Sequence, residues 1–536
     1  MSERERAADA VVVGAGPNGL VAANLLADAG WDVLVLEAAD RPGGAVRTEE
    51  VVAPGYRSDL FSAFYPFGRV SPILRGLELE RFGLRWRRAP AALAHLLPDD
   101  ECAVIAEDVD RTAESVAAFA PGDGDAWREE FQLWHQVREA LVAAILTPFP
   151  PVRAATRLAR RLGVGDGLRF ARMAALPART FGQQRFTGEG AQLLLAGNAL
   201  HTDLGPGHSG GALFGWLLCM LAQDVGFPVP VGGAGALTDA LVARLTTRGG
   251  RIECGRPVEL VRAIGGRAVG VVAEDGEPIR ARRAVLATVP APTLYLHMLE
   301  PDQLPARLLA DMRRFRWDDA TVKIDWALAG PIPWTNPAAA EAGTVHLGAD
   351  LAGLAGYSAS LAGGRLPRAP FLVLGQMATA DPSRAPEGGE SVWAYTHVPR
   401  GLNWSADRLR RCADRIQSVV ERHAPGFGER VVGRRIQGPQ DLERADANLV
   451  EGAINGGSAA LDQQLFFRPG PGLGRADTPV DRLFLAGASA HPGGAVHGGP
   501  GANAARAALV RDGVGGSVYA ALIRRAHARI YAGQAG

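Results

Sequence analysis

The sequence predicts an α/β fold in which an N-terminal nucleotide-binding unit is interleaved with a mixed α+β part. Three observations support this prediction. Residues 10–36 follow a strand–helix–strand pattern of apolar residues that ends its helix at Gly30. A second apolar strand, at 482–486, runs into a glycine-rich loop near the other end of the chain. Between them there is no repeat and no low-complexity linker, so we expect the parts to interleave rather than to follow one another.

The remaining elements are predicted from hydrophobic periodicity and from turn residues. We expect a mostly helical stretch from 76 to 230, with 126–146 as its clearest amphipathic helix. Turns of the Gly-Gly and Asp-Gly type separate short apolar runs after residue 250, which predicts a group of strands there. The strands expected in the second half lie at 251–254, 258–264, 268–273, 284–288, 321–328, 370–377 and 391–397, with helices at 236–247, 406–423 and 500–511.

The composition limits the functional classes. A hydrophobic fraction of 47 % in 536 residues excludes global disorder and predicts several structural units. The 57 basic residues equal the 57 acidic ones, which argues against a nucleic-acid partner. Four cysteines stand far apart and form no pair at metal-ligand spacing, so we expect neither a disulfide framework nor a metal site, as in a reducing cytosol.

Targeting signals are not evident in this sequence. The charged start contains no apolar signal-peptide core. The longest apolar stretch, 212–222, is shorter than the roughly 20 residues that a membrane-spanning helix needs. We therefore expect a cytoplasmic protein without a transmembrane segment, and peripheral contact with a membrane stays open.

The strongest motif is Gly14-Ala-Gly16-Pro17-Asn18-Gly19, which follows the first strand and opens the first helix. In this Rossmann-type context the glycines permit a tight turn, close approach of a pyrophosphate and helix–strand packing. Glu37 ends the next strand, 18 residues after Gly19, where a carboxylate binds ribose hydroxyls and disfavours a 2′-phosphate. The pattern predicts FAD or NAD rather than NADP.

Two further glycine-rich segments extend this prediction. Gly43 and Gly44 follow the acidic strand closely enough to approach the same pyrophosphate, and Arg47 could neutralise it. The late loop 487–501 precedes a helix whose N-terminal N–H groups can stabilise negative charge on a reduced flavin. We therefore expect the flavin ring at this loop.

These motifs resemble those of the phytoene desaturase and amine oxidase flavoproteins. His491-Pro-Gly-Gly494 and Leu461-Asp-Gln-Gln-Leu-Phe-Phe-Arg468-Pro469 resemble the phytoene dehydrogenase-related branch, and most closely the subgroup named for pyridine nucleotide-disulfide oxidoreductase domain-containing protein 2. The resemblance spans about residues 8–512 and implies an extended FAD. One departure is Ala45, where carotenoid desaturases usually have arginine after the glycine pair.

The resemblance also implies two discontinuous domains. An FAD-binding domain would comprise 8–75, 231–300 and 475–515, and a substrate-binding domain 76–230 and 301–474. The residues expected to bind FAD are Gly14, Gly16, Pro17, Asn18, Gly19, Glu37, Ala38, Gly43, Gly44, Arg47, Val258, Gly487, Gly493, Gly494, Val496 and Ala502.

Two residues are candidates for a catalytic role. Lys323, the only lysine of the chain, lies on an alternating strand; in the amine oxidase branch a similar lysine holds a water against flavin N5 and assists reoxidation. The alternative is an ordinary strand lysine with its head in solvent. His491 lies in the flavin loop, where it either touches the ring or holds the loop. Five aromatic residues could line an apolar cavity, although core packing is the favoured interpretation for each; they are Trp393, Tyr395, Trp404, Phe466 and Phe467.

These features predict an FAD-dependent oxidoreductase. It would remove two hydrogens from a C–C or C–N bond of a largely apolar small molecule, with hydride passing to flavin N5 and electrons passing on to oxygen or a quinone. The alternatives are a flavin amine oxidase that uses oxygen, and an FAD-dependent polyene isomerase. A binding protein that kept the fold and lost the flavin would need a degraded flavin loop, and the loop is intact.

Overall fold

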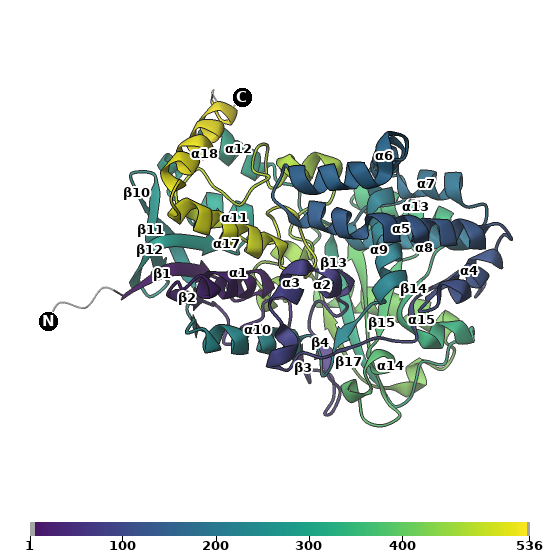
Figure 1. Ribbon diagram of the computed structural model, residues 1–536. Helices are drawn as coiled ribbons and strands as arrows, with labels where there is room; N and C mark the ends of the chain where they lie inside the picture. Colours follow the sequence, from purple (N-terminus) through teal and green to yellow (C-terminus); the bar gives the residue numbers. More distant parts are fainter. Residues whose placement is uncertain (1–5, 533–536) are drawn as a thin grey trace.

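The computed structural model describes residues 6–532 and contains two large sheets that lie side by side (Figure 1). The first sheet has the order β10-β11-β12-β1-β2-β9, with β18 paired to β12. Its strands are β1 (Arg6–Val13), β2 (Val33–Leu36), β9 (Arg251–Glu253), β10 (Val258–Ile264), β11 (Arg267–Ala273), β12 (Pro278–Ala287) and β18 (Leu483–Leu485). Segments from the start, middle and end of the chain therefore build one sheet.

The parallel part of this sheet brings its loops to one edge. Strand β1 runs parallel to β2 and β12, β2 runs parallel to β9, and β12 runs parallel to β18. Strand β2 is apolar throughout, and β1 and β12 are apolar over their last four residues, because helices cover both faces there. The residues that follow these strands meet at the carboxyl edge, where ligands of such sheets bind. Its covering helices include α1 (Pro17–Asp28), α10 (Gly235–Thr247), α11 (Ala291–His297) and α17 (Gly499–Asp512).

The second sheet has the order β17-β13-β16-β15-β14-β6-β7. Strand β13, next to the edge strand β17, pairs antiparallel with both β16 and β17, and all nine of its residues are buried. The strands are β6 (Ala91–Leu96), β7 (Cys102–Ala106), β13 (Ala320–Leu328), β14 (Ala342–Leu347), β15 (Leu372–Gln376), β16 (Glu390–Val398) and β17 (Val431–Gln437).

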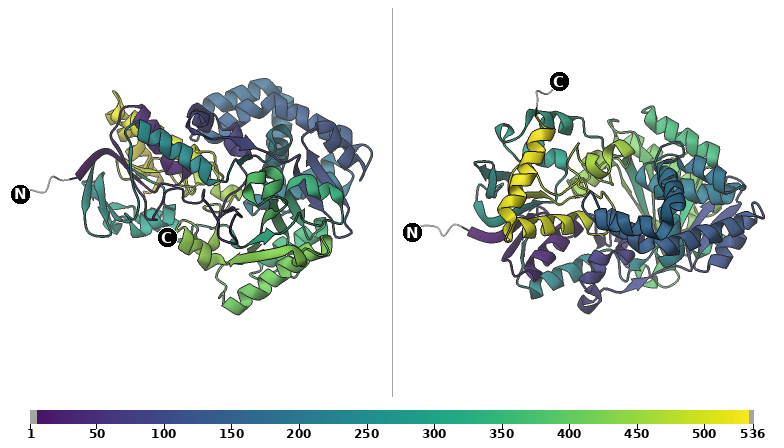
Figure 2. Two further views of the ribbon diagram at one scale, coloured as in Figure 1. Left: turned by 90° about the horizontal axis from the view of Figure 1, so that it is seen from below. Right: turned by 45° about the horizontal axis from the view of Figure 1, so that its top comes forward.

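Helices from the first half of the chain cover one face of this sheet (Figures 1 and 2). Trp127, Trp134 and Trp216 are fully buried and form the centre of this helical layer. The helices are α4 (Val109–Ala117), α5 (Asp123–Leu146), α6 (Val152–Ala175), α7 (Ala178–Arg185), α8 (Glu189–Ala199) and α9 (Gly211–Val225). On the other side, α15 (Ala406–His423) packs its apolar stripe against the sheet.

Several elements differ from the prediction, and three of them are instructive. Strands β6 and β7 lie inside the region predicted to be mostly helical. The first reads Ala-Ala-Leu-Ala-His-Leu and contains no β-branched residue, so its strand form is imposed by burial between β14 and β7 rather than by propensity. A final helix, α18 (Gly516–Ile530), follows the predicted last helix and packs against α17.

Other features bear on the sequence expectations. Within residues 6–532, no helix is long and apolar enough to span a membrane. The four cysteines are free thiols. Over the same residues, His, Cys, Asp and Glu form no group of three or more that could hold a metal ion.

Candidate functional site

The first glycine motif forms the turn between β1 and α1. Gly14 has a φ of +97°, and a β-carbon there would lie 2.2 Å from the hydroxyl oxygen of Thr288. A β-carbon on Gly19 would lie 2.0 Å from the carbonyl oxygen of Gly14. Helix α1 starts at Pro17 after Gly16, and no side chain caps it. Its first N–H groups are thus open to an anion, which the helix N-terminus favours.

The second glycine turn faces the first one. Gly44 has a φ of +51°, and a β-carbon there would lie 3.1 Å from the Cα of Gly16. The N–H of Gly43 donates to the carbonyl oxygen of Ala15 at 2.9 Å. Backbone therefore meets backbone with no side chain between the two turns. This cradle suits a pyrophosphate, which needs close approach of N–H groups.

Glu37 is fixed beside this cradle by two backbone donors. Its Oε2 accepts from the N–H of Ala15 at 2.7 Å, and its Oε1 accepts from the N–H of Ala39 at 2.9 Å. The remaining lone pairs of the carboxylate are available to ribose hydroxyls. Ala38 lies between these contacts.

A pocket of about 280 Å³ continues from Glu37 toward β10. The N–H groups of Gly255 and Arg256 donate to the carbonyl oxygens of Ala39 and Glu37, at 2.7 and 2.8 Å. Val258 begins β10 directly after this pocket. The pocket is lined by Gly255, Arg256, Pro257, Ala273, Glu274 and Asp275.

Arg47 lies at the cradle but is already engaged. Its Nε donates to the carbonyl oxygen of Gly44 at 3.0 Å, and one terminal nitrogen donates to that of Ala445 at 2.6 Å. The guanidinium carbon lies 5.3 Å from the centre of the Phe61 ring. Arg47 therefore fixes the second turn, and its other terminal nitrogen is the part that a phosphate would contact.

The late glycine loop meets the first motif. A β-carbon on Gly487 would lie 2.4 Å from the carbonyl oxygen of Thr288, whose hydroxyl donates to the carbonyl oxygen of Val13 at 2.7 Å. A β-carbon on Gly501 would lie 1.9 Å from the carbonyl oxygen of Asn18, so α17 packs backbone to backbone against α1. Thr288 joins both motifs, yet nothing in the sequence distinguishes it from any threonine after a strand.

The same loop carries the other residues expected near the ring. Gly493, Gly494 and Val496 lie in it, and Ala502 is fully buried in the first turn of α17. A β-carbon on Gly494 would lie 2.6 Å from the carbonyl oxygen of Asn455. Helix α17 begins after Gly498. The N–H of Gly499 donates to Nδ1 of His497 and Pro500 has no N–H, so an anion at this helix start would meet the N–H groups that follow Pro500.

Both loop histidines are buried and hold the loop. The Nε2 of His491 lies 3.0 Å from the carbonyl oxygen of Thr147, and burial lowers the pKa of the imidazole. His497 accepts from the N–H of Gly499 at 3.0 Å and lies edge-on to Phe67, and burial lowers its pKa to about 4. Both rings are therefore neutral at pH 7.

Arg468 anchors the loop from the other side. Arg468 belongs to the motif 461–469 that carries the family resemblance, but the motif alone gives it no role. Its side chain is 1 % exposed and donates to the carbonyl oxygens of Ser458, Gly456 and Ala488 at 3.1, 3.1 and 2.9 Å. Burial lowers its pKa to about 10, with Asp318 and Asp203 opposing that shift. The guanidinium thereby ties 455–458 to the flavin loop.

Lys323 is buried, which contradicts the reading of a strand lysine with its head in solvent. Its Nζ donates to the carbonyl oxygen of Asp59 at 3.0 Å and to Oδ1 of Asp325 at 2.5 Å. The Asp59 carboxylate pairs with Arg384 at 2.8 Å and accepts from the N–H of Ala234 at 2.8 Å. Burial raises the pKa of Asp325, and Lys323 opposes the rise. An ammonium has three N–H groups, so one remains for a water.

A buried polar cluster lies in the second sheet and the segments beside it, and no local pattern in the sequence points to it because its members are far apart in the chain. His397 is 2 % exposed, and its Nε2 is buried with no hydrogen-bond partner among the described residues. Burial lowers its pKa, and Asp319 opposes the shift. Asp203 also has a buried oxygen without a partner, and burial raises its pKa. Tyr395 lies edge-on to His397 with ring centres 5.4 Å apart.

This polar cluster is connected to the flavin loop through Asn455. The Nδ2 of Asn455 donates to the carbonyl oxygen of His201 at 3.3 Å, two residues before Asp203. The backbone of Asn455 packs against Gly494. Asn455 therefore links the loop at which the flavin ring is expected to the segment that carries His201 and Asp203.

Comparisons with known proteins identify the family of this chain. Residues 18–509 match the family described as flavin containing amine oxidoreductase. The chain is 30 % identical to pyridine nucleotide-disulfide oxidoreductase domain-containing protein 2 of Rattus norvegicus, covering 93 % of this chain and 92 % of that one. It is 25 % identical to a neurosporene-forming phytoene desaturase of Rhodobacter capsulatus, covering 91 % of each. A solved structure of a putrescine oxidase is similar in fold, with a TM-score of 0.58, 18 % identity and coverage of 97 % and 99 %.

The residues present fit the cofactor of that family. The bare cradle at Gly16 and Gly44, the fixed Glu37 and the uncapped start of α1 provide donors and space for a dinucleotide. The chain belongs to the family of flavin-containing amine oxidoreductases and is an FAD-dependent oxidoreductase.

Proposed function

We propose that this chain removes two hydrogens from a C–C or C–N bond of a largely apolar small molecule. Bound FAD supplies the hydride acceptor at its N5 position. The observation that carries the proposal is the meeting of both glycine motifs at Thr288, with Asn455 linking the late loop to the segment that holds Asp203 of the buried cluster. A relative that acts on phytoene, a hydrocarbon, supports an apolar substrate.

The chain's own residues would divide the binding of FAD among them. Glu37 would bind the ribose, and the N–H groups at the start of α1 and around Gly44 would bind the pyrophosphate. The start of α17 would place partial positive charge at the ring. Arg468 and Thr288 would position the loops without touching the reacting atoms.

The proton that leaves with the hydride needs an acceptor, and we propose His397 for this role. Its burial keeps the imidazole neutral, and its free Nε2 can take a proton. Asp319 would then stabilise the imidazolium. An imidazole among buried acids in a dry site is the kind of base that such a step requires.

Oxygen is the acceptor that we favour over a quinone, and the observation behind this choice is the burial of Lys323 with one N–H left for a water. The same observation keeps a flavin amine oxidase as the second candidate. In that case the hydrogens would come from a C–N bond, and the product would be an imine together with peroxide. A polyene isomerase would use the same site without net reduction of the flavin. The four free thiols agree with a reducing cytoplasmic location.

Anaerobic mixing of the FAD-loaded protein with two groups of compounds tests the proposal. One group contains apolar polyenes in detergent, and the other contains apolar amines. Bleaching of the flavin by polyenes, followed by recovery and peroxide formation in air, supports C–C dehydrogenation with oxygen as acceptor. Bleaching by amines alone supports the second candidate. If polyenes are isomerised without bleaching, the proposed dehydrogenation is wrong.

A further inference from the structure

One face of the molecule exposes apolar side chains that the sequence analysis placed in a core or a cavity. Phe466 and Phe467 are 42 % and 36 % exposed, so the core prediction is wrong for this pair. Neighbouring apolar side chains are exposed as well and form, with this pair, what we call the apolar strip. The strip consists of Val152, Leu461, Leu465, Phe466, Phe467 and Ile530.

The strip is continuous across three segments of the chain. The ring of Phe149, just before α6, lies 5.3 Å from the ring of Phe466, and its N–H donates to the carbonyl oxygen of Gly474 at 3.2 Å. The hydroxyl of Tyr531, at the end of α18, donates to the carbonyl oxygen of Pro471 at 2.9 Å. The strip thus runs from the start of α6 to the end of α18, and both helices lie along the upper edge of Figure 1.

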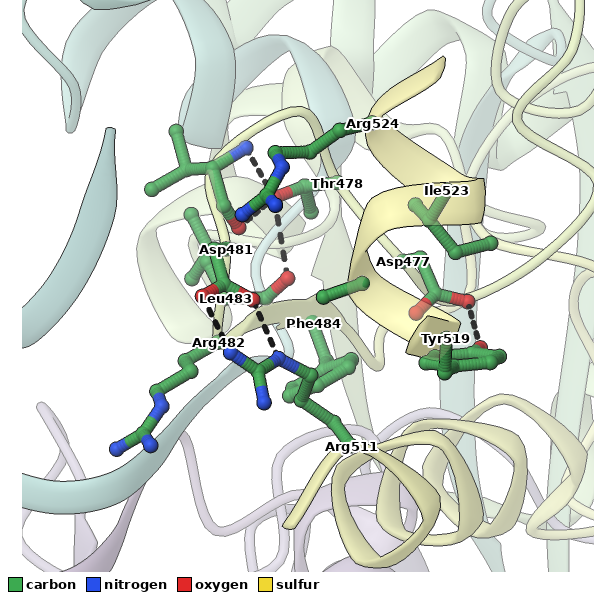
Figure 3. Close-up of a pocket in the computed structure, with 12 residues that line it drawn as sticks. Asp477, Thr478, Asp481, Arg482, Leu483, Phe484, Arg511, Tyr519, Ile523 and Arg524 are labelled. Atoms are coloured by element: carbon green, nitrogen blue, oxygen red, sulfur yellow. Dashed lines mark hydrogen bonds and ion pairs between the residues drawn. The ribbon is translucent and has the colours of Figure 1, made fainter. Parts of the chain in front are cut away.

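Helix α18 is held from its inner side, where Tyr519, Ile523 and Arg524 line a small space (Figure 3). The hydroxyl of Tyr519 donates to Asp477 at 2.7 Å, and Arg511 pairs with Asp481 at 2.7 Å beneath the helix. The enclosed space is about 20 Å³, room for about one water, and does not form a ligand site. On the helix, Val518, Leu522, Arg525 and Arg529 are exposed, and Val514 is exposed just before it.

The charge of this face departs from that of the whole chain. Basic and acidic residues are equal in number overall, yet α6 contains six arginines and one aspartate, and α18 contains three arginines and no acidic residue. Arg153 and Arg157 on α6 and Arg525 and Arg529 on α18 are exposed, and none of the described residues pairs them with a carboxylate. Arginines therefore flank the strip on both sides.

We propose that this face binds the surface of a membrane that contains anionic lipids. Exposed aromatic and aliphatic side chains between arginine-rich helices match the chemistry of a headgroup layer over acyl chains. A second copy of the same face would bring arginines against arginines, which disfavours a symmetric dimer. Thr147, whose carbonyl oxygen lies 3.0 Å from His491, connects this face to the flavin loop, so lipid would lie close to the site. The inference does not depend on the proposed reaction.

Flotation of the FAD-loaded full chain with phospholipid vesicles tests the inference. The probes are vesicles of phosphatidylcholine alone and of phosphatidylcholine with phosphatidylglycerol. We expect flotation with the anionic vesicles and little with the neutral ones, and we expect added salt to weaken it. Arg153→Glu/Arg157→Glu/Arg525→Glu should weaken binding about a hundredfold or more, because each arginine near such a surface contributes about a fivefold factor.

A second variant separates insertion of the strip from charge alone. Leu465→Ser/Phe466→Ser should weaken binding about tenfold or more, since both side chains would lose burial in the lipid. Val432→Ser on β17 and Arg410→Glu/Arg411→Glu on α15 change exposed side chains elsewhere and should bind like the parent. Flavin absorption of each variant reports folding. Three results would overturn the proposal. They are equal binding by all variants, no flotation with anionic vesicles, and a dimer that these same substitutions disrupt.

Discussion

Gly14→Ala and Gly83→Ala form a matched pair that tests how the cradle is built. Both glycines have a φ of +97°, so alanine strains the backbone equally at the two positions. A β-carbon at Gly83 meets nothing within 4 Å, whereas one at Gly14 would lie 2.2 Å from the hydroxyl oxygen of Thr288. Any difference between the variants therefore reports the contact and not the backbone strain.

The two costs can be estimated separately. A left-handed alanine costs about 1–2 kcal/mol, of which the less flexible unfolded chain returns about 0.4–1 kcal/mol. Gly83→Ala should thus lower the free energy of unfolding by about 1 kcal/mol. At position 14 the overlap adds about 1–3 kcal/mol. Thr288 cannot turn away freely, because its hydroxyl donates to the carbonyl oxygen of Val13 at 2.7 Å.

The assay compares flavin content and urea midpoint for parent and variants. Gly83→Ala should keep full flavin content with a slightly lower midpoint. Gly14→Ala should lose most of its flavin, since the turn that faces the pyrophosphate must move. Equal flavin content in the two variants would refute the role of this turn.

Three further predictions follow from the site. Glu37→Gln keeps the shape but loses charge-assisted hydrogen bonds worth about 1.5–3 kcal/mol, so FAD should bind about 10- to 100-fold more weakly in a fluorescence titration; parental affinity would contradict the ribose assignment. Lys323→Met should slow the reoxidation of the reduced flavin by oxygen. The substitution is combined with Asp325→Asn, because Asp325 would otherwise be an unpaired buried carboxylate. The control is Asp325→Asn alone, and equal reoxidation rates in the two proteins would rule out a role of Lys323 in reoxidation. Burial lowers the pKa of His201 and His497 from 6.5 to about 4, so the unfolded chain gains protons first and stability should fall as the pH drops from 6.5 to 4. The urea midpoints at pH 7 and pH 5 measure this loss of stability, and the loss should be smaller in His497→Asn. An equal change of the midpoint in parent and variant would contradict the contribution of His497.

The cofactor site follows from local sequence for physical reasons. The turn at Gly14, the carboxylate at Glu37 and the pair at Gly43 and Gly44 lie within one strand–helix–strand unit, where spacing fixes geometry. The late loop at Gly487 could be assigned to the same site because a buried strand precedes it and a helix follows it. Each of these signals is contained in a few dozen residues.

The substrate side could not be predicted in the same way. His397, Asp203 and Asp319 become neighbours only through the pairing of β13 with β16 and the path of the chain after α8. Strand β6 lacks β propensity and owes its form to its neighbours. Thr288 and Arg468 act through backbone carbonyl groups, which leave no pattern in the sequence.

The most direct test of the central claim is the absorption spectrum of the purified protein, followed by anaerobic reduction and return of air. The account predicts flavin bands that match about one FAD per chain, that bleach on reduction and that recover within seconds in air. Slow recovery over minutes would contradict oxygen as the acceptor. A colourless protein that cannot be reconstituted with FAD would contradict the assignment of the site itself.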